Sequence, residues 1–138
     1  MTVTHTLGKK ERLCSKLLVD KLFSGKANSM SAWPVRAVFL LSEKAPLDKA
    51  SVEVLVSVSK RYFKRAVKRN RVKRQIREAY RTNKAMLAEV MAQHPGEKLL
   101  VAFIWQDAHL HSSAKVDAKM VNLLQRMAER LAVEKEES

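Results

Sequence analysis

Two periods in the hydrophobic pattern divide the first half of the chain into its expected elements. Leucines at three- and four-residue spacing predict a helix over Lys9–Phe23, and Ser24–Trp33 is expected to form a loop. A run rich in Val, Phe and Leu predicts a strand over Val35–Leu41. Alternating valines predict another strand over Ser51–Ser59, after a turn at Glu43–Lys49. Two neighbouring strands joined by a turn indicate an antiparallel hairpin.

The second half of the chain shows a helical period, an unbroken apolar run, and a second helical period. A long helix is predicted over Phe63–Gln93, closed by Pro95 and Gly96. The run LLVAFIW, Leu99–Trp105, has the length of a strand. Its lack of alternation is typical of a strand that is covered on both faces. Apolar positions at helical spacing predict a last helix over Asp117–Val133.

These elements predict an α+β fold in one small domain. Their order is a helix, strands, a long helix, a strand and a last helix, which is typical of a sandwich of one sheet and its helices. A length of 138 residues with 46% hydrophobic residues suffices for one domain with one core. The acidic tail, Glu134–Ser138, is expected to fray.

Several classes of site and location are disfavoured by what the chain lacks. Cys14 is the only cysteine, so no intramolecular disulfide can form, and it is expected in or near the core. The histidines lack zinc-ligand spacing and are expected on the surface or in loops; they are His5, His94, His109 and His111. The sequence shows neither a secretory signal nor a membrane span, which favours the cytoplasm.

Positive charge is concentrated in one segment of the chain. The whole chain carries a formal charge of +13, and residues Lys60–Lys84 contain twelve Lys or Arg and a single acid, Glu78. That segment carries +11 in 25 residues, whereas the remainder carries only +2. A concentrated positive patch is what binding to a phosphate backbone requires.

Helical geometry separates this segment into two faces. At about 100° per residue, one arc carries a core stripe made of Val72, Ile76, Ala79, Tyr80, Asn83, Leu87 and Val90. Another stripe carries Asn70, Arg74, Arg77 and Arg81, flanked by Lys73 and Lys84. Arginine suits this role because its planar guanidinium can donate two hydrogen bonds to one phosphate. The helix is therefore expected to present guanidinium groups to an outside partner.

Two arginines conflict with a helix that begins at Phe63. Arg65 and Arg69 would project along the extension of the core stripe, where burying unpaired guanidinium groups is costly. Either the helix overhangs the sheet before Val72, or it begins later. Both arrangements leave the segment Arg69–Arg71 accessible.

Other interpretations of the basic segment compete with RNA binding. A solvated face usually mixes charges of both signs, and membrane or calmodulin binding needs an apolar side that the core already uses. A protein nuclease needs paired carboxylates or a His/Lys acid–base pair, and the sequence shows no such constellation. A general basic RNA-binding or ribosome-associated protein and a DNA-binding domain stay open as alternatives.

The stretch VSVSKRYFKRAVKRNRVKRQIREAYR, Val56–Arg81, resembles the signature of the bacterial ribonuclease P protein family. The matching motifs are the tract Arg69, Asn70 and Arg71, then Lys73-Arg74 and Arg77-Glu78, and the preceding Val58-Ser59-Lys60-Arg61. The resemblance covers roughly residues 7–131. It implies a compact α-β-β-β-α-β-α domain similar to one ribosomal-protein domain.

The resemblance also implies a function, which is removal of the 5′ leader from precursor tRNA. In this family the catalyst is a large RNA that uses Mg²⁺ to activate water, and the protein assists it. No catalytic residue and no protein-bound metal are therefore expected in this chain. The implied partners are ribonuclease P RNA and precursor tRNA, without a membrane and without a required protein partner.

Specific residues take roles through the same resemblance. The residues expected to contact the catalytic RNA are Lys68, Arg69, Asn70, Arg71, Lys73, Arg74, Arg77 and Arg81. Phe23 and Phe39 match aromatic positions in a leader-binding cleft, with Lys60 and Arg61 nearby. Core packing is the competing interpretation of both phenylalanines, and the sequence alone favours it. The chain departs from the family pattern at Val19, Glu53, Leu55, Phe103 and Ile104.

Overall fold

The computed structural model describes residues 27–43 and 51–137 of the chain. Its elements are β1 (Asn28–Ala32), β2 (Val35–Glu43), β3 (Val52–Ser57), α2 (Ala66–Asn83), α3 (Ala85–Met91), β4 (Glu97–Trp105) and α4 (Ser113–Glu137). This order confirms the predicted α+β fold. The predicted helix Lys9–Phe23, with Cys14, and most of the predicted turn Glu43–Lys49 lie outside the described residues.

The strands form one four-stranded sheet in the order β1-β2-β4-β3. Strand β4 pairs antiparallel with β2 and parallel with β3, so it lies inside the sheet. This position explains its unbroken apolar run, because residues on both of its faces are buried, from Leu99 to Phe103. The predicted hairpin between the second and third strands is wrong, because β4 separates β2 from β3.

The hairpin partner of β2 is β1, a strand where the sequence predicted a loop. Strand β1 pairs antiparallel with β2 across the turn at Trp33–Pro34, with Met30 opposite Ala37. The segment NSMSA lacks β-branched and aromatic residues, so its side chains gave no strand signal. Backbone pairing with β2 and the partly buried Met30 hold it in the sheet edge.

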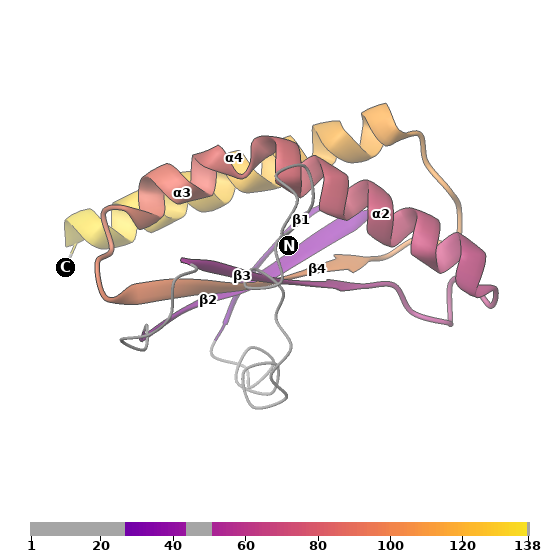
Figure 1. Cartoon of the computed structure of the whole chain (residues 1–138), viewed down its shortest axis with the longest axis horizontal. Coiled ribbons are helices and arrows are strands. Elements are labelled where there is room, and N and C mark those ends of the chain that lie inside the picture. The colour runs from indigo at the N-terminus through magenta and orange to yellow at the C-terminus, as the bar shows by residue number, and fades with distance from the viewer. Residues whose placement is uncertain (1–26, 44–50, 138) are drawn as a thin grey trace, which may run out of the picture.

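Helices α2, α3 and α4 cover one face of the sheet (Figure 1). The predicted core stripe is confirmed, since Val72, Ile76, Ala79, Tyr80, Leu87 and Val90 are all buried. Asn83 is half-buried and donates from Nδ2 to the carbonyl oxygen of Ala79 (2.8 Å) and to Oδ1 of Asp117 (3.1 Å), which ties α2 to α4. The apolar positions that predicted the last helix are buried on α4; they are Met120, Leu123, Leu124, Met127 and Leu131. None of the helices in the described part of the chain is long and apolar enough to cross a membrane.

The helix boundaries differ from the predicted ones. The predicted helix Phe63–Gln93 is two helices, α2 and α3, separated at Lys84 and ending at Met91. Gly96, at a left-handed φ of 81°, then turns the chain into β4, as the predicted stop required. The last helix was predicted over Asp117–Val133, and α4 begins at Ser113 and continues to Glu137. Most of the acidic tail therefore continues the helix.

The opposite face of the sheet carries a smaller apolar cluster and an ion pair. Val38, Leu100 and Ala102 are buried on that face. Beside them, Nζ of Lys98 lies 3.2 Å from Oε1 of Glu53, and the two side chains are only 8% and 16% exposed. One of the residues that depart from the family pattern, Glu53, therefore has a defined partner on β4.

Candidate nucleic-acid interface

A short turn after β3 places two cations beside the start of α2. The side-chain oxygen of Ser59 accepts a hydrogen bond from the backbone N–H of Arg61 (3.0 Å), and its carbonyl accepts one from Tyr62 (3.1 Å). Phe63 is buried and anchors the turn in the core. Lys60 and Arg61 are consequently exposed, and the Arg61 guanidinium lies 5.7 Å from the centroid of the Tyr62 ring.

The first turn of α2 extends past the end of β3 (Figure 1) and is strongly electropositive. Lys64, Arg65 and Lys68 are exposed there. The N-cap residue, Arg65, makes no side-chain capping bond, and the first turn holds no acidic residue. The free N–H groups of a helix N-terminus and its dipole favour anions, so this end reinforces the charge of the side chains.

Arg69 is placed differently from its neighbours. It is half-buried, and its Nη1 donates to the carbonyl oxygens of Phe63 (2.7 Å) and Lys64 (2.8 Å). These bonds provide acceptors for the Arg69 guanidinium, which a helix beginning at Phe63 would have buried without a partner. Both proposed solutions are therefore realised: the helix begins later, at Ala66, and it overhangs the sheet.

The rest of the predicted basic stripe lies along the side of α2 that faces away from the core. Lys68, Asn70, Arg71 and Arg74 are exposed, whereas Lys73, Arg77 and Arg81 are half-buried. Arg81 is engaged with the only acid of the segment, because its Nε donates to Oε2 of Glu78 (3.1 Å) and its Nη2 donates to Oε1. The hydrogen bond that Arg81 donates to Glu78 raises the pKa of Arg81, and the carboxylate compensates its charge locally.

Three exposed cations of α2, Lys68, Arg71 and Arg74, have no hydrogen-bonded or ionic partner within the part of the chain that the structure describes. Without a bound anion, the positive charges of these neighbouring side chains repel one another. These exposed groups are available for pairing with the phosphates of an approaching polyanion.

Three of the four predicted leader-binding residues, Phe39, Lys60 and Arg61, lie in the described part of the chain. Lys60 and Arg61 stand at the start of the basic surface, and Phe23 lies outside the described residues. Phe39 is fully buried on the helix-facing side of β2, opposite Val101, inside the main core cluster. Its ring has no exposed face on which a base could stack, so core packing accounts for it.

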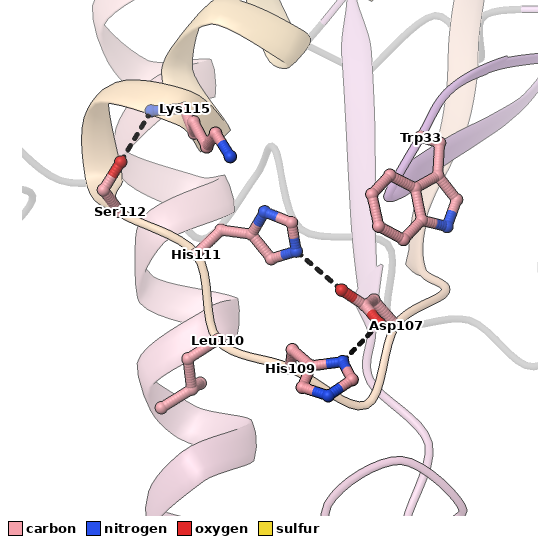
Figure 2. Close-up of a pocket in the computed structure, with 7 residues that line it drawn as sticks. All are labelled: Trp33, Asp107, His109, Leu110, His111, Ser112 and Lys115. Atoms are coloured by element: carbon pink, nitrogen blue, oxygen red, sulfur yellow. Dashed lines mark hydrogen bonds and ion pairs between the residues drawn. The ribbon is translucent and has the colours of Figure 1, made fainter.

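A second cluster lies in the loop between β4 and α4, and the sequence analysis missed it. Oδ2 of Asp107 accepts from Nε2 of His111 (2.6 Å), and Oδ1 accepts from Nδ1 of His109 (3.2 Å). Figure 2 shows both imidazoles converging on that carboxylate. The alternating spacing of one acid and two histidines in a loop was the available signal, but it matches no zinc motif.

The three described histidines, His94, His109 and His111, lie in loops as predicted, but they differ in exposure. His94 is buried, 5% exposed, and its Nε2 lies 3.1 Å from the carbonyl oxygen of Leu131. The His111 side chain is only 12% exposed, whereas that of His109 is 86% exposed. Within residues 27–43 and 51–137, no group of three or more His, Cys, Asp or Glu side chains is arranged to hold a metal ion.

Comparison with known proteins agrees with this arrangement. The family model described as Ribonuclease P matches residues 7–128. The Ribonuclease P protein component of Porphyromonas gingivalis W83 is 42% identical over 90 residues, which cover 65% of this chain and 64% of that protein. The corresponding protein of Chlorobaculum tepidum is 32% identical over 109 residues, covering 75% of this chain and 69% of that protein. These matches span about two thirds of the length of each relative.

A solved structure shows the same fold. The RNase P protein from Thermotoga maritima superposes with a TM-score of 0.60 at 20% sequence identity. The superposition covers 84% of this chain and 96% of that one.

Proposed function

The chain belongs to the ribonuclease P protein family, and we propose that it is the protein subunit of a cytoplasmic ribonuclease P ribonucleoprotein. In this role it binds the catalytic RNA and the 5′ leader of precursor tRNA. It assists the endonucleolytic hydrolysis that removes the leader and leaves the mature 5′ end of the tRNA. The chain itself contributes binding and positioning, and the RNA contributes the chemistry.

The exposed cation row on α2 carries this proposal. Lys68, Arg71 and Arg74 lie on a helix whose opposite side is buried, so their Cα positions are fixed before any RNA arrives. A guanidinium on a rigid helix can donate two hydrogen bonds to a phosphate at little entropic cost. Asn70, exposed between Arg69 and Arg71, adds an amide able to pair with a base edge or a ribose hydroxyl. The row therefore suits a folded RNA with closely spaced phosphates.

The division of labour follows from the side chains available. We assign the Mg²⁺ requirement to the RNA, which would hold the metal, and the metal would there supply the activation of water. Lys60 and Arg61, at the end of the basic surface, are assigned to the leader strand. Their exposure and the ring of Tyr62 beneath Arg61 support contact with a flexible single strand.

Two alternatives differ from this proposal in partner. A general basic RNA-binding or ribosome-associated protein would use the same cations without a catalytic RNA. A DNA-binding domain would need a helix able to enter a groove. Helix α2 is packed against the sheet and α4 over most of its length, and only its first turns overhang, which favours lateral contact with phosphates.

A competition experiment separates the RNA and DNA alternatives. Labelled ribonuclease P RNA bound to the protein is challenged with precursor tRNA, with an unrelated structured RNA, and with duplex DNA. The proposal predicts displacement in that order of strength. It also predicts that Arg71→Ala weakens binding, whereas Lys119→Ala, which removes an exposed cation of α4, does not. Equal displacement by duplex DNA would contradict it.

A further inference from the structure

A pocket outside the basic helix has the chemistry of a nucleotide site. It lies between the turn that joins β1 to β2, the loop that joins β4 to α4, and the first turn of α4, and its volume is about 590 Å³. Its lining residues are Trp33, Asp107, His109, Leu110, His111, Ser112 and Lys115. In Figure 2, Trp33 and Lys115 lie on opposite sides of the His111 ring.

The inner wall of the pocket is held in place by several independent contacts. The Asp107 carboxylate accepts from both imidazoles, and its carbonyl oxygen accepts from Nε1 of Trp105 (2.7 Å). The His111 ring meets Trp105 edge-on, with ring centroids 5.3 Å apart. The wall is therefore formed before any ligand binds, which lowers the cost of binding.

Trp33 provides an open aromatic face at the rim. Trp33 is 58% exposed, although an aromatic ring of this size usually gains free energy when it is buried. The edge of the neighbouring His111 ring, at a centroid distance of 5.5 Å, steadies the indole from one side. A steadied and exposed indole is a platform on which a base can stack whatever its identity.

The rim also carries two polar side chains that can contact a phosphate, of which Lys115 is a cation. Lys115 is exposed on the first turn of α4, and His109 is exposed on the loop. The one acid among the lining residues, Asp107, is only 11% exposed, and both of its oxygens accept hydrogen bonds from histidines. An aromatic platform flanked by cations is how proteins hold single-stranded nucleic acid.

The pocket is joined directly to the basic helix. Nε2 of Gln75 donates to the carbonyl oxygen of His111 (3.0 Å) and to Oγ of Ser113 (3.2 Å). Gln75 stands one helical turn after Arg71 on α2 and next to Arg74. Gln75 therefore ties the loop that lines the pocket to the helix that carries the cation row.

We propose that this pocket binds one unpaired nucleotide of RNA, whose base stacks on Trp33 while the adjoining phosphates contact Lys115 and His109. The pocket adds a second, single-strand-selective contact to the RNA-binding function proposed above, and rests on it. A base in a duplex has both of its faces covered and cannot reach the indole, so the site discriminates unpaired from paired RNA.

The test compares a short unstructured oligouridine with an RNA duplex of the same length. Trp33→Leu and Lys115→Ala are each expected to weaken oligouridine binding about tenfold and to leave duplex binding unchanged. Trp33→Phe keeps a ring and should retain most of the affinity. Lys119→Ala, one turn further along α4, removes an equivalent exposed charge that does not line the pocket and serves as the control.

A cross-linking measurement on the unmodified protein tests the same contact without a substitution. It keeps the proposal testable if Trp33→Leu perturbs the turn. Irradiation of bound oligonucleotide containing 5-iodouridine should attach it to Trp33, as mapped by mass spectrometry. The pocket proposal is overturned if oligouridine affinity survives Trp33→Leu and Lys115→Ala while Arg71→Ala lowers it, and that result leaves the proposed function standing. If Arg71→Ala changes neither RNA while Trp33→Leu weakens oligouridine binding, the cation row fails and the pocket stands.

Discussion

Nη1 of Arg69 donates a hydrogen bond of 2.7 Å to the carbonyl oxygen of Phe63. This bond connects helix α2 to the turn that precedes the helix. The same nitrogen reaches the carbonyl of Lys64. Arg71, two residues on, is exposed and makes no comparable contact within the described residues. Two arginines of one motif are thus placed differently: Arg69 is bonded to the turn, and Arg71 is exposed, as the proposed RNA contact requires.

This difference predicts that the two arginines separate stability from RNA binding. Arg69→Ala should lower the free energy of unfolding by about 1 to 2 kcal/mol, because two carbonyl oxygens lose a charged donor. Arg71→Ala should change it by less than about 0.5 kcal/mol, as expected for an exposed position. Urea unfolding followed by circular dichroism measures both. Equal stability of the two variants would contradict the role given to Arg69.

Salt dependence of RNA binding should report the number of phosphates that α2 neutralises. Removing Lys68, Arg71 or Arg74 singly should reduce the slope of log K against log salt by about 0.7 to 0.9 each. The triple alanine variant should lose roughly the sum. Lys119→Ala is the control and should leave the slope unchanged. A triple variant with the slope of the unmodified protein would remove the cation row from the interface.

The ion pair on the far face of the sheet should matter for stability. Glu53→Gln removes the carboxylate 3.2 Å from Lys98 while leaving the buried ammonium in place, and should cost about 2 kcal/mol of unfolding free energy. Adding Lys98→Met should recover part of that loss, because the buried charge is then gone as well. Chemical unfolding of the two single variants and the double variant measures the coupling. Strictly additive losses would show that the pair contributes nothing.

Acid stability should depend on Asp107. The hydrogen bond from His111 lowers the pKa of Asp107 below its ordinary value of 3.8; burial opposes this shift, and His109 adds to it. Because the folded pKa lies below the unfolded one, the ionised carboxylate stabilises the fold above about pH 4, and this stability is lost as the pH falls further. Asp107→Asn should therefore show a flatter decline of melting temperature below about pH 4. An unchanged acid limb in that variant would contradict the assignment.

Local patterns predicted the elements better than their pairing. The run Leu99–Trp105 predicted a strand covered on both faces, which is how β4 lies. The strands that flank it are separated from it by dozens of residues, and adjacency in sequence favoured the wrong hairpin. A strand that is buried on both faces belongs in the middle of its sheet. This rule would have placed β4 between β2 and β3 and so excluded the predicted hairpin.

The part of the candidate site that lies on α2 was predictable from the charge and spacing of its residues. The cations of α2 were found because helical spacing fixes which residues share a face, and the core stripe confirmed that geometry. The pocket beside Trp33 could not be predicted from the sequence. Its lining residues come from two loops and a helix end that lie together only in the folded sheet. Strand β1 was missed for a related reason, since pairing with β2 and not its own side chains defines it.

The most direct test of the central claim is a cleavage assay at low Mg²⁺. Labelled precursor tRNA is incubated with this protein alone, with a bacterial ribonuclease P RNA alone, and with both together. The account predicts cleavage at the leader junction only when both are present, and a weaker stimulation by Arg71→Ala than by the unmodified protein. Cleavage by the protein alone, or no stimulation of the RNA at any protein concentration, would contradict it.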